Sequence, residues 1–514
     1  MEIINFIMAI SPIIFVLIGI LVLKKPAMKV APVALLWTML LAFTYFNIGD
    51  LAFKANVTIL DALIWKGIKE GLKIVLMVFG AFTILNTLKR TGAIEDVKNT
   101  VARVSGKDRR VQLVIIGMMV PIFLEGAAGA GAPAAIAAPF LVALGFDPIT
   151  AIAVALLGDA TPCSWGGAGL TTINGGAALV EAGISTNALN SAMVGRIHMF
   201  GALIIPFIIT AVGFGRKGFK GIIPYLCYAG VTTGAVMFAL SNFVGPEVTS
   251  MGTGLISILL SVAYVKFVPI KTPDEYTYEV AADTKMKYGA FRAMSPYLYM
   301  LVLLPVVRYG FPAIVENGFA IMCTFGYIVW VDVVILVCGI LGAITLGVKY
   351  KEMMETYAET LRNVIPVLIT MGSLLTVAYI MQSASTGMMS LIATDIAGVA
   401  GMVYPAAAVF IGSMGSFITG TGLASNTMFA GMHMEASALL DINPITVFAG
   451  QNSGASLGNL ICPNNTVAAC ATVGEVGNEN KVMKRTLPSF AIILSVYMVL
   501  CMIYTLVLFP NFGM

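Results

Sequence analysis

Charged residues are scarce in this chain: Asp, Glu, Lys and Arg together make up 11% of its 514 residues. A soluble domain carries about 25%, so this scarcity excludes a soluble domain of any size. The formal net charge is only +4, which excludes a nucleic-acid-binding patch. The seven cysteines are scattered through apolar segments without a Cys-x-x-Cys pair, which argues against a disulfide framework and against a metal site.

Instead, the chain is rich in long apolar runs. Hydrophobic residues make up 59% of it, and its mean hydropathy is +0.93. Three runs, 3–23, 221–243 and 489–509, reach the roughly 20 residues that a membrane-spanning helix needs. The first has no Lys or Arg before Lys24 and is too long for the apolar region of a cleaved signal. These patterns predict an all-α polytopic membrane protein that keeps its first span.

About twelve full spans are expected along the chain. They lie near 3–23, 30–48, 71–88, 148–180, 196–214, 221–243, 250–268, 294–310, 319–346, 363–381, 444–474 and 489–509. Two further apolar segments, 111–145 and 402–440, are each too long for one span and have a polar, Gly-rich centre. We interpret both as re-entrant hairpins, each entering and leaving the membrane on one side.

The basic residues sit in the short loops between these spans and give the orientation. By the positive-inside rule, loop 24–29 should be cytoplasmic. Counting from there places both termini outside and every strong basic cluster inside; these clusters are 89–90, 107–110, 216–220, 269–292, 349–351 and 481–485. The stretch 50–70 would lie outside yet carries three lysines balanced by three acids, so we interpret it as an interfacial segment.

Two parts of the chain repeat one pattern. The first reads Phe123-Leu-Glu-Gly126, Asp147-Pro-Ile-Thr150 and Gly158, and the second reads Phe417-Ile-Thr-Gly420, Asn443-Pro-Ile-Thr446 and Gly454. The spacing from Pro to the last Gly is 10 residues in both copies, and Thr-Gly pairs at 91–92 and 386–387 extend the match upstream. Seven expected spans, an odd number, separate the starts of the copies. The copies therefore face opposite sides of the membrane, as in an inverted repeat with alternating access.

Polar, Gly-rich breaks at membrane depth should form the binding site. Irregular backbone is tolerated there only where it is buried in protein or lines a wet cavity. Four such breaks are expected, at 125–133, 158–169, 419–427 and 451–466. Each should end one half-helix and begin another. A half-helix N-terminus offers free N–H groups and the positive end of a dipole, which suits a carboxylate.

The predicted substrate site collects the small and neutral polar residues of these breaks. Its glycines let the backbone approach a ligand closely, and its hydroxyl and amide side chains add neutral hydrogen-bonding groups. The predicted residues are Gly126, Ala127, Gly129, Gly131, Thr161, Ser164, Thr419, Gly420, Thr421, Gly422, Ser425, Asn426, Thr427, Gln451, Asn452, Ser453, Asn464 and Asn465. No metal ligands and no catalytic residues are predicted.

Ionisable residues inside a membrane are costly and are therefore functional candidates. Glu125 stands at the tip of the first hairpin and Asp159 in the first broken span, and both are candidates to carry a coupling proton. The alternative is a structural ion pair with Arg196 or Arg308. The two histidines, His198 and His433, are expected to have interfacial or packing roles.

At these residues the chain resembles the lactate permease family. The strings that carry the resemblance are 123–139, 241–247, 420–427 and 467–474, and it runs over nearly the whole chain. It implies a bacterial or archaeal plasma-membrane symporter of L-lactate, D-lactate and glycolate driven by protons. It also implies kinship with elevator-type carboxylate transporters, in which paired hairpins and broken helices hold the substrate. Asp159 departs from the family, where an uncharged side chain is usual, and leaves the coupling ion open between proton and sodium.

The expected organisation follows from the repeat. Residues 1–70 form N-terminal scaffold helices and the interfacial segment, 71–180 the first repeat, 181–346 scaffold and linking helices, 347–474 the second repeat and 475–514 the last helix. No cofactor is expected; the partners are the substrate, the coupling ion and the lipid bilayer, and the scaffold could form a homodimer. A sodium-coupled carrier, a membrane-embedded enzyme and a channel are the alternatives. The breaks hold no His and no ligand cluster, which disfavours an enzyme, and a channel needs no inverted hairpins.

Overall fold

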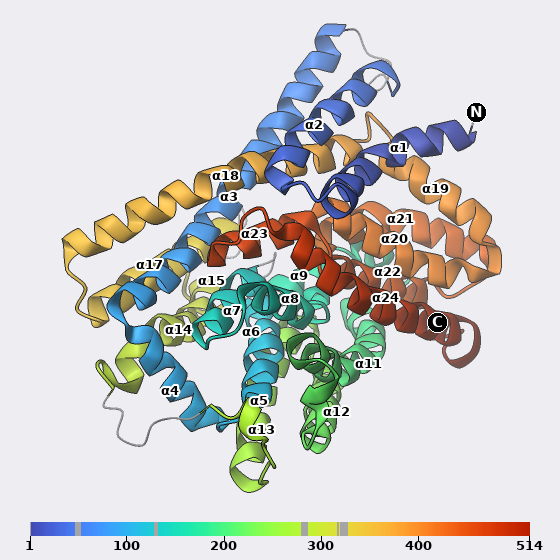
Figure 1. Ribbon diagram of the computed structural model, residues 1–514. Helices are drawn as coiled ribbons and strands as arrows, with labels where there is room; N and C mark the ends of the chain where they lie inside the picture. The colour runs from blue at the N-terminus through green and yellow to red at the C-terminus, as the bar shows by residue number, and fades with distance from the viewer. Residues whose placement is uncertain are drawn as a thin grey trace.

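The structure is a computed structural model that describes residues 2–46, 53–127, 132–278, 286–315, 318 and 327–513. Over these residues the regular structure is helical throughout, with no β-strand, as the apolar composition predicts. Figure 1 shows the helices packed at many different angles, with α3 and α18 as two long rods along one side of the molecule.

Most of the helices can be assigned to one of the two copies of the repeat. The chain begins with α1 (Glu2–Leu17), η1 (Ile18–Val22) and α2 (Ala27–Thr44). The first copy comprises α3 (Phe53–Thr91), α4 (Ala93–Ser105), α5 (Arg109–Val114), η3 (Ile115–Met119), α6 (Val120–Ala127), α7 (Ala132–Ala143), α8 (Pro148–Asp159), η4 (Pro162–Trp165), α9 (Gly166–Ile173) and α10 (Ala177–Glu181). The second comprises α18 (Tyr350–Gln382), α19 (Met388–Ala400), η8 (Gly401–Val403), α20 (Tyr404–Thr419), α21 (Gly422–Leu440), α22 (Pro444–Gly458) and α23 (Pro463–Val473).

Further helices link and end the two copies. Between them lie α11 (Asn187–Phe214), η5 (Arg216–Phe219), α12 (Ile223–Phe243), α13 (Pro246–Phe267), η6 (Asp274–Tyr276), α14 (Gly289–Pro305), η7 (Val306–Gly310), α15 (Phe311–Ile314) and α17 (Tyr327–Thr345). The chain ends with α24 (Glu479–Ile503) and η9 (Tyr504–Leu508).

Seven helices in the described part of the chain are long and apolar enough to cross a membrane. They are Ile3–Val22, Ala27–Thr44, Asn187–Phe214, Ile223–Phe243, Pro246–Phe267, Met388–Thr419 and Glu479–Leu508. The chain is an integral membrane protein. Six of these seven helices coincide with expected spans, and the seventh, Met388–Thr419, reaches into the second predicted hairpin. The count of about twelve spans stays a prediction, and residues 319–326 of the expected span 319–346 lie outside the described residues.

The two copies begin their broken spans in the same way. At the start of α8 the Asp147 side chain accepts a hydrogen bond from the backbone N–H of Thr150. At the start of α22 the Asn443 side chain accepts from the N–H groups of Ile445 and Thr446. Each cap is followed by proline in the first turn, where its missing N–H costs nothing. The matched Asp/Asn-Pro-Ile-Thr strings are therefore helix starts.

Ten residues beyond these prolines, a glycine lets each broken span touch the first arm of its own hairpin. A Cβ on Gly158 would lie 2.0 Å from the carbonyl oxygen of Gly117, and one on Gly454 would lie 1.9 Å from that of Val409. No side chain fits either gap. The shared spacing in the sequence thus reflects the same close backbone contact in both copies.

The long helices α3 and α18 also cross through small residues. A Cβ on Gly67 would lie 2.1 Å from Thr376 Oγ1, and one on Gly71 would lie 3.0 Å from the backbone nitrogen of Gly372. Small residues spaced by four allow helix backbones to approach closely in membranes. The expected boundary at residue 70 falls inside α3, which runs unbroken from Phe53 to Thr91. The predicted interfacial segment is, in its described part, the first half of this helix.

The second hairpin is two packed helices joined by a tight turn. Helix α20 ends at Thr419, and Gly420 follows with a φ of +77°, in the left-handed region that favours glycine. The side chain of Thr421 then caps α21 by accepting a hydrogen bond from Ala424 N–H. In the first hairpin, residues 128–131 lie outside the described residues, so its tip beyond Ala127 is not described.

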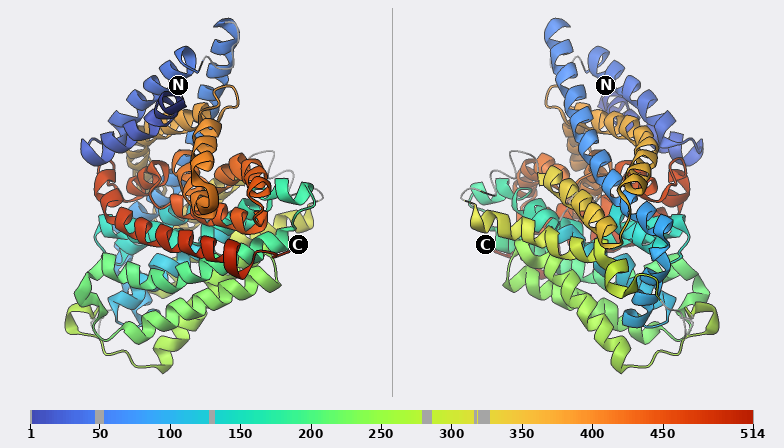
Figure 2. Two further views of the ribbon diagram at one scale, coloured as in Figure 1. Left: turned by 90° about the vertical axis from the view of Figure 1, so that its right-hand side faces the viewer. Right: turned by 90° about the vertical axis from the view of Figure 1, so that its left-hand side faces the viewer.

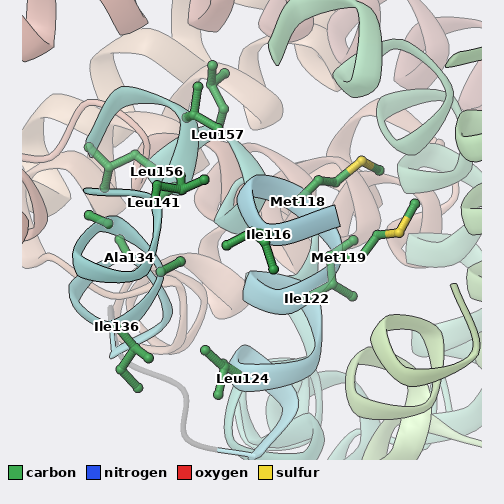
Figure 3. Packing of buried hydrophobic residues seen from close by; sticks show 14 of the residues in the cluster. Ile116, Met118, Met119, Ile122, Leu124, Ala134, Ile136, Leu141, Leu156 and Leu157 are labelled. Atoms are coloured by element: carbon green, nitrogen blue, oxygen red, sulfur yellow. The ribbon is translucent and has the colours of Figure 1, made fainter. Parts of the chain in front are cut away.

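Buried hydrophobic side chains hold the first hairpin against its broken span. Ile116 and Ile122 come from the first arm, Ile136 and Leu141 from the second, and Leu157 from α8. Figure 3 shows these side chains gathered between the three helical segments. Each is at most 6% exposed, so the hairpin and the broken span form one packed unit.

The basic clusters that were predicted to share one side are joined to one another in the structure. Hydrogen bonds or ion pairs connect Ala27 to Glu479, Arg485 to Asp147, Arg109 to Gly145, Arg110 to Lys220, Asp108 to Thr272, Lys287 to Thr91 and Arg90 to Glu355. The base of the second hairpin instead contacts the C-terminus, where Asn443 Nδ2 donates to the carbonyl oxygen of Phe512 at 2.9 Å. Figure 2 shows the C-terminus on the side opposite the start of α24.

This arrangement predicts opposite accessibility for the two hairpin bases. In a background in which the exposed Cys227 is replaced by Ser, Lys107→Cys should react with a membrane-impermeant thiol reagent only from the cytoplasm. Met402→Cys, at a side chain that is 62% exposed, should react only from outside. Asp108 is unsuitable as a probe because it is buried in an ion pair with Arg110. Labelling of both positions from one side would rule out an inverted repeat.

Candidate functional site

The two broken spans meet in the middle of the molecule. Residues Ala160 and Thr161 follow the end of α8, where helix carbonyls lack partners within the helix. The Ser456 hydroxyl of α22 donates to both carbonyl oxygens, at 2.8 Å and 3.3 Å. One copy of the repeat therefore supplies the polar group that the break in the other copy requires.

A second set of hydrogen bonds joins the same two breaks. The amide of Asn452 donates to Thr172 Oγ1 at 2.8 Å, and Thr172 donates to the carbonyl oxygen of Ser164 at 2.6 Å. The Ser164 hydroxyl in turn lies 3.3 Å from the carbonyl oxygen of Asn452. All three side chains are buried, and together they fix η4 against α22.

The tip of the second hairpin closes over this junction. A Cβ on Gly422 would lie 3.2 Å from Thr171 Cγ2 and 3.7 Å from Cys163 Sγ. The amide of Asn426 donates to the carbonyl oxygen of Thr171 at 3.2 Å. The first residues of α21 thus contact the first broken span directly.

The two predicted acids lie together beside the same junction. Glu125 is 1% and Asp159 is 2% exposed, and the two side chains are close enough for each to act on the charge of the other. Glu125 Oε1 packs against Gly166, the first residue of α9, and Glu125 also contacts the thiol of Cys163. Two neighbouring buried carboxyl groups do not both ionise readily, so such a pair is suited to hold one proton.

The alternative ion pair with Arg196 is not formed. The guanidinium of Arg196 lies instead over the rings of Phe238, Phe509 and Phe512, at 4.8 to 5.8 Å from their centroids. These cation–π contacts are an attractive environment for arginine near a membrane surface. The side chain of Arg308, the other alternative partner, lies outside the described residues.

Several polar atoms near the junction have no hydrogen-bond partner among the described residues. They are Thr161 Oγ1, Asn452 Oδ1, Ser453 Oγ and Asn464 Oδ1, together with Glu125 Oε2 and Asp159 Oδ1, which face no N–H or O–H donor. A buried polar atom without a partner costs about 1–3 kcal/mol. We therefore take these atoms as candidates to pair with a polar ligand.

Both histidines are buried and are bonded through both ring nitrogens. His198 lies 2.7 Å from Ser164 Oγ and 2.9 Å from the hydroxyl of Tyr497. His433 lies 2.8 Å from Gln451 Oε1 and 2.7 Å from the hydroxyl of Tyr404. These contacts are consistent with the predicted packing role. The two chains of hydrogen bonds end on η4 and on α22, beside the site.

A double-mutant cycle should detect the first of these chains. His198→Phe and Tyr497→Phe should each lower the free energy of unfolding by about 1–3 kcal/mol, since each leaves a buried polar group unpaired. The double variant should cost less than the sum, because both partners are then apolar. The measurement is chemical unfolding in detergent. Strictly additive losses would show that the two side chains do not interact.

The structure does not bring every predicted residue to the junction. Thr427 is exposed and donates to the carbonyl oxygen of Leu423 within its own helix, so it lies apart from the junction. Gly126 packs against the backbone of Met251 on α13 and also faces away. Thr419 bonds within the hairpin turn.

The remaining predicted residues divide into three groups. Gln451 bonds to Ser425 at 3.0 Å and so braces the second hairpin, and Asn465 Nδ2 bonds to the carbonyl oxygen of Asn459 at 3.4 Å. Residues that contact the junction or its unpaired atoms are Thr161, Ser164, Gly420, Gly422, Asn426, Asn452, Ser453 and Asn464, with Thr421 as the cap that starts α21. Gly129 and Gly131, and the side chain of Ala127, lie outside the described residues.

Sequence reasoning missed some residues that form the junction. Cys163, Ser456 and Asn459 all lie inside predicted breaks, and Asn459 bonds both Ser416 and the thiol of Cys163. Taking every polar residue of the breaks would have found them. Thr172 lies three residues beyond its break, and no sequence signal identifies it.

Comparisons with known proteins agree over almost the whole chain. The family model described as L-lactate permease matches residues 5–325 and 309–509. The glycolate permease GlcA of Escherichia coli (strain K12) is 26% identical, over 95% of this chain and 93% of that protein. The L-lactate permease of the same strain is also 26% identical, over 92% of this chain and 91% of that protein. A solved structure, the YdaH transporter of Alcanivorax borkumensis, matches with a TM-score of 0.39 at 13% identity, covering 92% of this chain and 98% of that chain.

Proposed function

Because this chain belongs to the L-lactate permease family, we propose that it is a secondary transporter that imports lactate and glycolate by proton symport. It acts in a prokaryotic plasma membrane with both termini outside. The observation that carries the proposal is the group of buried, unpaired polar atoms where the two inverted breaks meet. A small ligand with one carboxylate and one neighbouring hydroxyl would pair them.

The unpaired atoms match the two ends of a 2-hydroxy acid. The Oδ1 atoms of Asn452 and Asn464 accept hydrogen bonds, so either suits the substrate hydroxyl as a donor. The hydroxyls of Thr161 and Ser453 donate to a carboxylate. The N-terminus of α23, whose cap residue Cys462 makes no side-chain cap hydrogen bond, adds the positive end of a helix dipole. A 2-hydroxymonocarboxylate would therefore be recognised at both ends.

The carboxyl pair supports coupling to protons. Glu125 and Asp159 are buried in contact beside Gly422 and Cys163. One proton held between the two acids would enter with the substrate and leave after the site opens to the other side. In this proposal Glu125 is the principal proton carrier, and Asp159 shares the proton.

The moving part of an elevator-type cycle would be larger than the repeats alone. A Cβ on Gly126 would lie 2.3 Å from the backbone nitrogen of Met251, and one on Gly254 would lie 2.2 Å from that of Phe123. Helices in contact through their backbones cannot slide past one another without separating. We therefore assign α13 to the transport domain with the first hairpin, although residues 181–346 were expected to be scaffold. Helices α3, α17 and α18 remain the scaffold.

Transport assays test the function directly. Purified protein in proteoliposomes should take up labelled L-lactate and glycolate when an inward proton gradient is imposed. Propionate and acetate lack the 2-hydroxyl and leave its acceptor unpaired, at a cost of about 1–3 kcal/mol, so they should compete about 5- to 150-fold less well. Accumulation that follows an imposed sodium gradient and ignores pH would replace the proton with sodium. Equal competition by propionate and lactate would reject hydroxyl recognition.

A further inference from the structure

A crevice on the surface of the protein separates the first hairpin from α13 and α14. Its volume is about 380 Å³, and it passes beneath α4. Hydrophobic side chains form its walls, including Ile115, Val120, Phe140, Ile258, Val262 and Met294. The inner wall is buried, with Phe140 5% exposed, whereas Val104 and Phe291 at the rim are 57% and 63% exposed. The crevice is thus open at its rim and apolar inside.

One end of this crevice is basic. Val262 lines it, and Lys266 lies four residues further along α13 on the same helix face. Thr100 lines it from α4, and Arg103 lies three residues further on. The two helix ends touch, because a Cβ on Gly106 would lie 2.8 Å from Val265 Cγ1. Lys266 and Arg103 therefore lie on the two helix ends that meet beside this end of the crevice.

Both basic side chains are available to an outside ligand. Lys266 and Arg103 are exposed, and neither forms an ion pair with an acid in the described part of the chain. Helix α4 begins and ends at the glycines 92 and 106, both with positive φ, and carries charged residues among its apolar ones. Such a helix is suited to lie at the membrane surface, which puts Arg103 at the level of lipid head groups.

We propose that the crevice binds one anionic phospholipid, with an acyl chain between the first hairpin and α14 and its phosphate on Arg103 and Lys266. An acyl chain matches the apolar walls, and a negative head group matches the two unpaired cations. Basic pockets between membrane helices recognise anionic head groups in this way. A zwitterionic lipid would fill the same apolar walls but would gain less from the cations.

Lipid retention tests the proposal without any transport measurement. The purified full-length protein is incubated in detergent micelles that contain phosphatidylglycerol or phosphatidylcholine, washed, and analysed for bound lipid by mass spectrometry. Wild type should keep about one phosphatidylglycerol in preference to phosphatidylcholine. Each basic residue near a lipid surface contributes about five-fold, so R103Q/K266Q should retain roughly 25-fold less phosphatidylglycerol.

Two further variants make the result specific. Val262→Trp should fill the crevice and reduce retention of both lipids, even with the cations intact. K481Q/K484Q removes two exposed lysines at the start of α24, away from the crevice, and should retain lipid like wild type. Equal retention by wild type and R103Q/K266Q, or equal retention of the two lipids by wild type, would overturn the proposal.

Discussion

Replacing Gly166 with alanine should abolish proton-driven uptake of lactate, although the variant should fold. Gly166 has φ −57° and ψ 144°, which alanine adopts freely. The added methyl carbon would lie 2.1 Å from Glu125 Oε1 and 3.1 Å from its carboxyl carbon. Because that carboxyl is the end of a flexible side chain, it can turn aside, which would break its contact with Asp159. A displacement of about 1 Å in a reacting group costs on the order of 100-fold in rate, and we expect a loss of that size.

A second glycine provides the matched control. Gly431 lies on α21, where an added Cβ would meet nothing within 4 Å. Gly431→Ala should therefore transport like wild type and should be slightly more stable, since alanine favours a helix by up to about 1 kcal/mol over glycine. Initial uptake rates in proteoliposomes and thermal unfolding in detergent separate the two effects. Normal uptake by Gly166→Ala would show that the orientation of Glu125 is unimportant.

The repeat could be predicted from the sequence because it is written in local signals. The helix starts at Asp147 and Asn443 follow from capping residues before proline. The turn at Gly420 follows from glycine between two apolar runs. Each of these features depends on a few neighbouring residues, so the sequence alone identifies the broken spans and the second hairpin.

Contacts between residues far apart in the sequence explain the features that could not be predicted from it. The segment 50–70 looked interfacial because of its charges, but Lys66 Nζ lies 4.3 Å from the ring centroid of Tyr379 on α18. That partner, 313 residues away, lets a charged segment continue as one helix. Arg196 was a plausible partner for a buried acid until the structure placed it over aromatic rings from α12 and the C-terminal end of the chain.

Which residues form the site also depends on contacts between distant parts of the chain. The predicted breaks at 158–169, 419–427 and 451–466 coincide with helix ends in the structure, but which polar residues face the junction depends on how the two copies dock. Ser456 contributes because it reaches the carbonyl of Ala160 from the other copy. Thr427 does not face the junction, because its position on α21 turns its side chain outward. Which side of a helix faces another helix depends on how the two helices pack. The sequence of one helix alone does not determine it.

Glu125→Gln should lose accumulation driven by a proton gradient while keeping lactate/lactate exchange. The amide can still donate a hydrogen bond to Asp159, so the buried contact survives, but it cannot bind and release a proton. Exchange needs no net release of protons and should continue near the wild-type rate. Accumulation needs one proton to leave with each substrate and should fall to the background of empty proteoliposomes. Glu181→Gln changes an exposed acid on α10 and serves as the control.

The behaviour of Asp159 decides how the proton is held. If the two acids share it, Asp159→Asn should lose accumulation as completely as Glu125→Gln, because either amide removes one half of the pair. If Asp159 only positions Glu125, its amide should keep the contact and most of the accumulation. Accumulation of lactate by Glu125→Gln against its gradient would exclude Glu125 as the carrier. Accumulation that follows sodium in the wild type would instead make Asp159 the leading ligand of a cation.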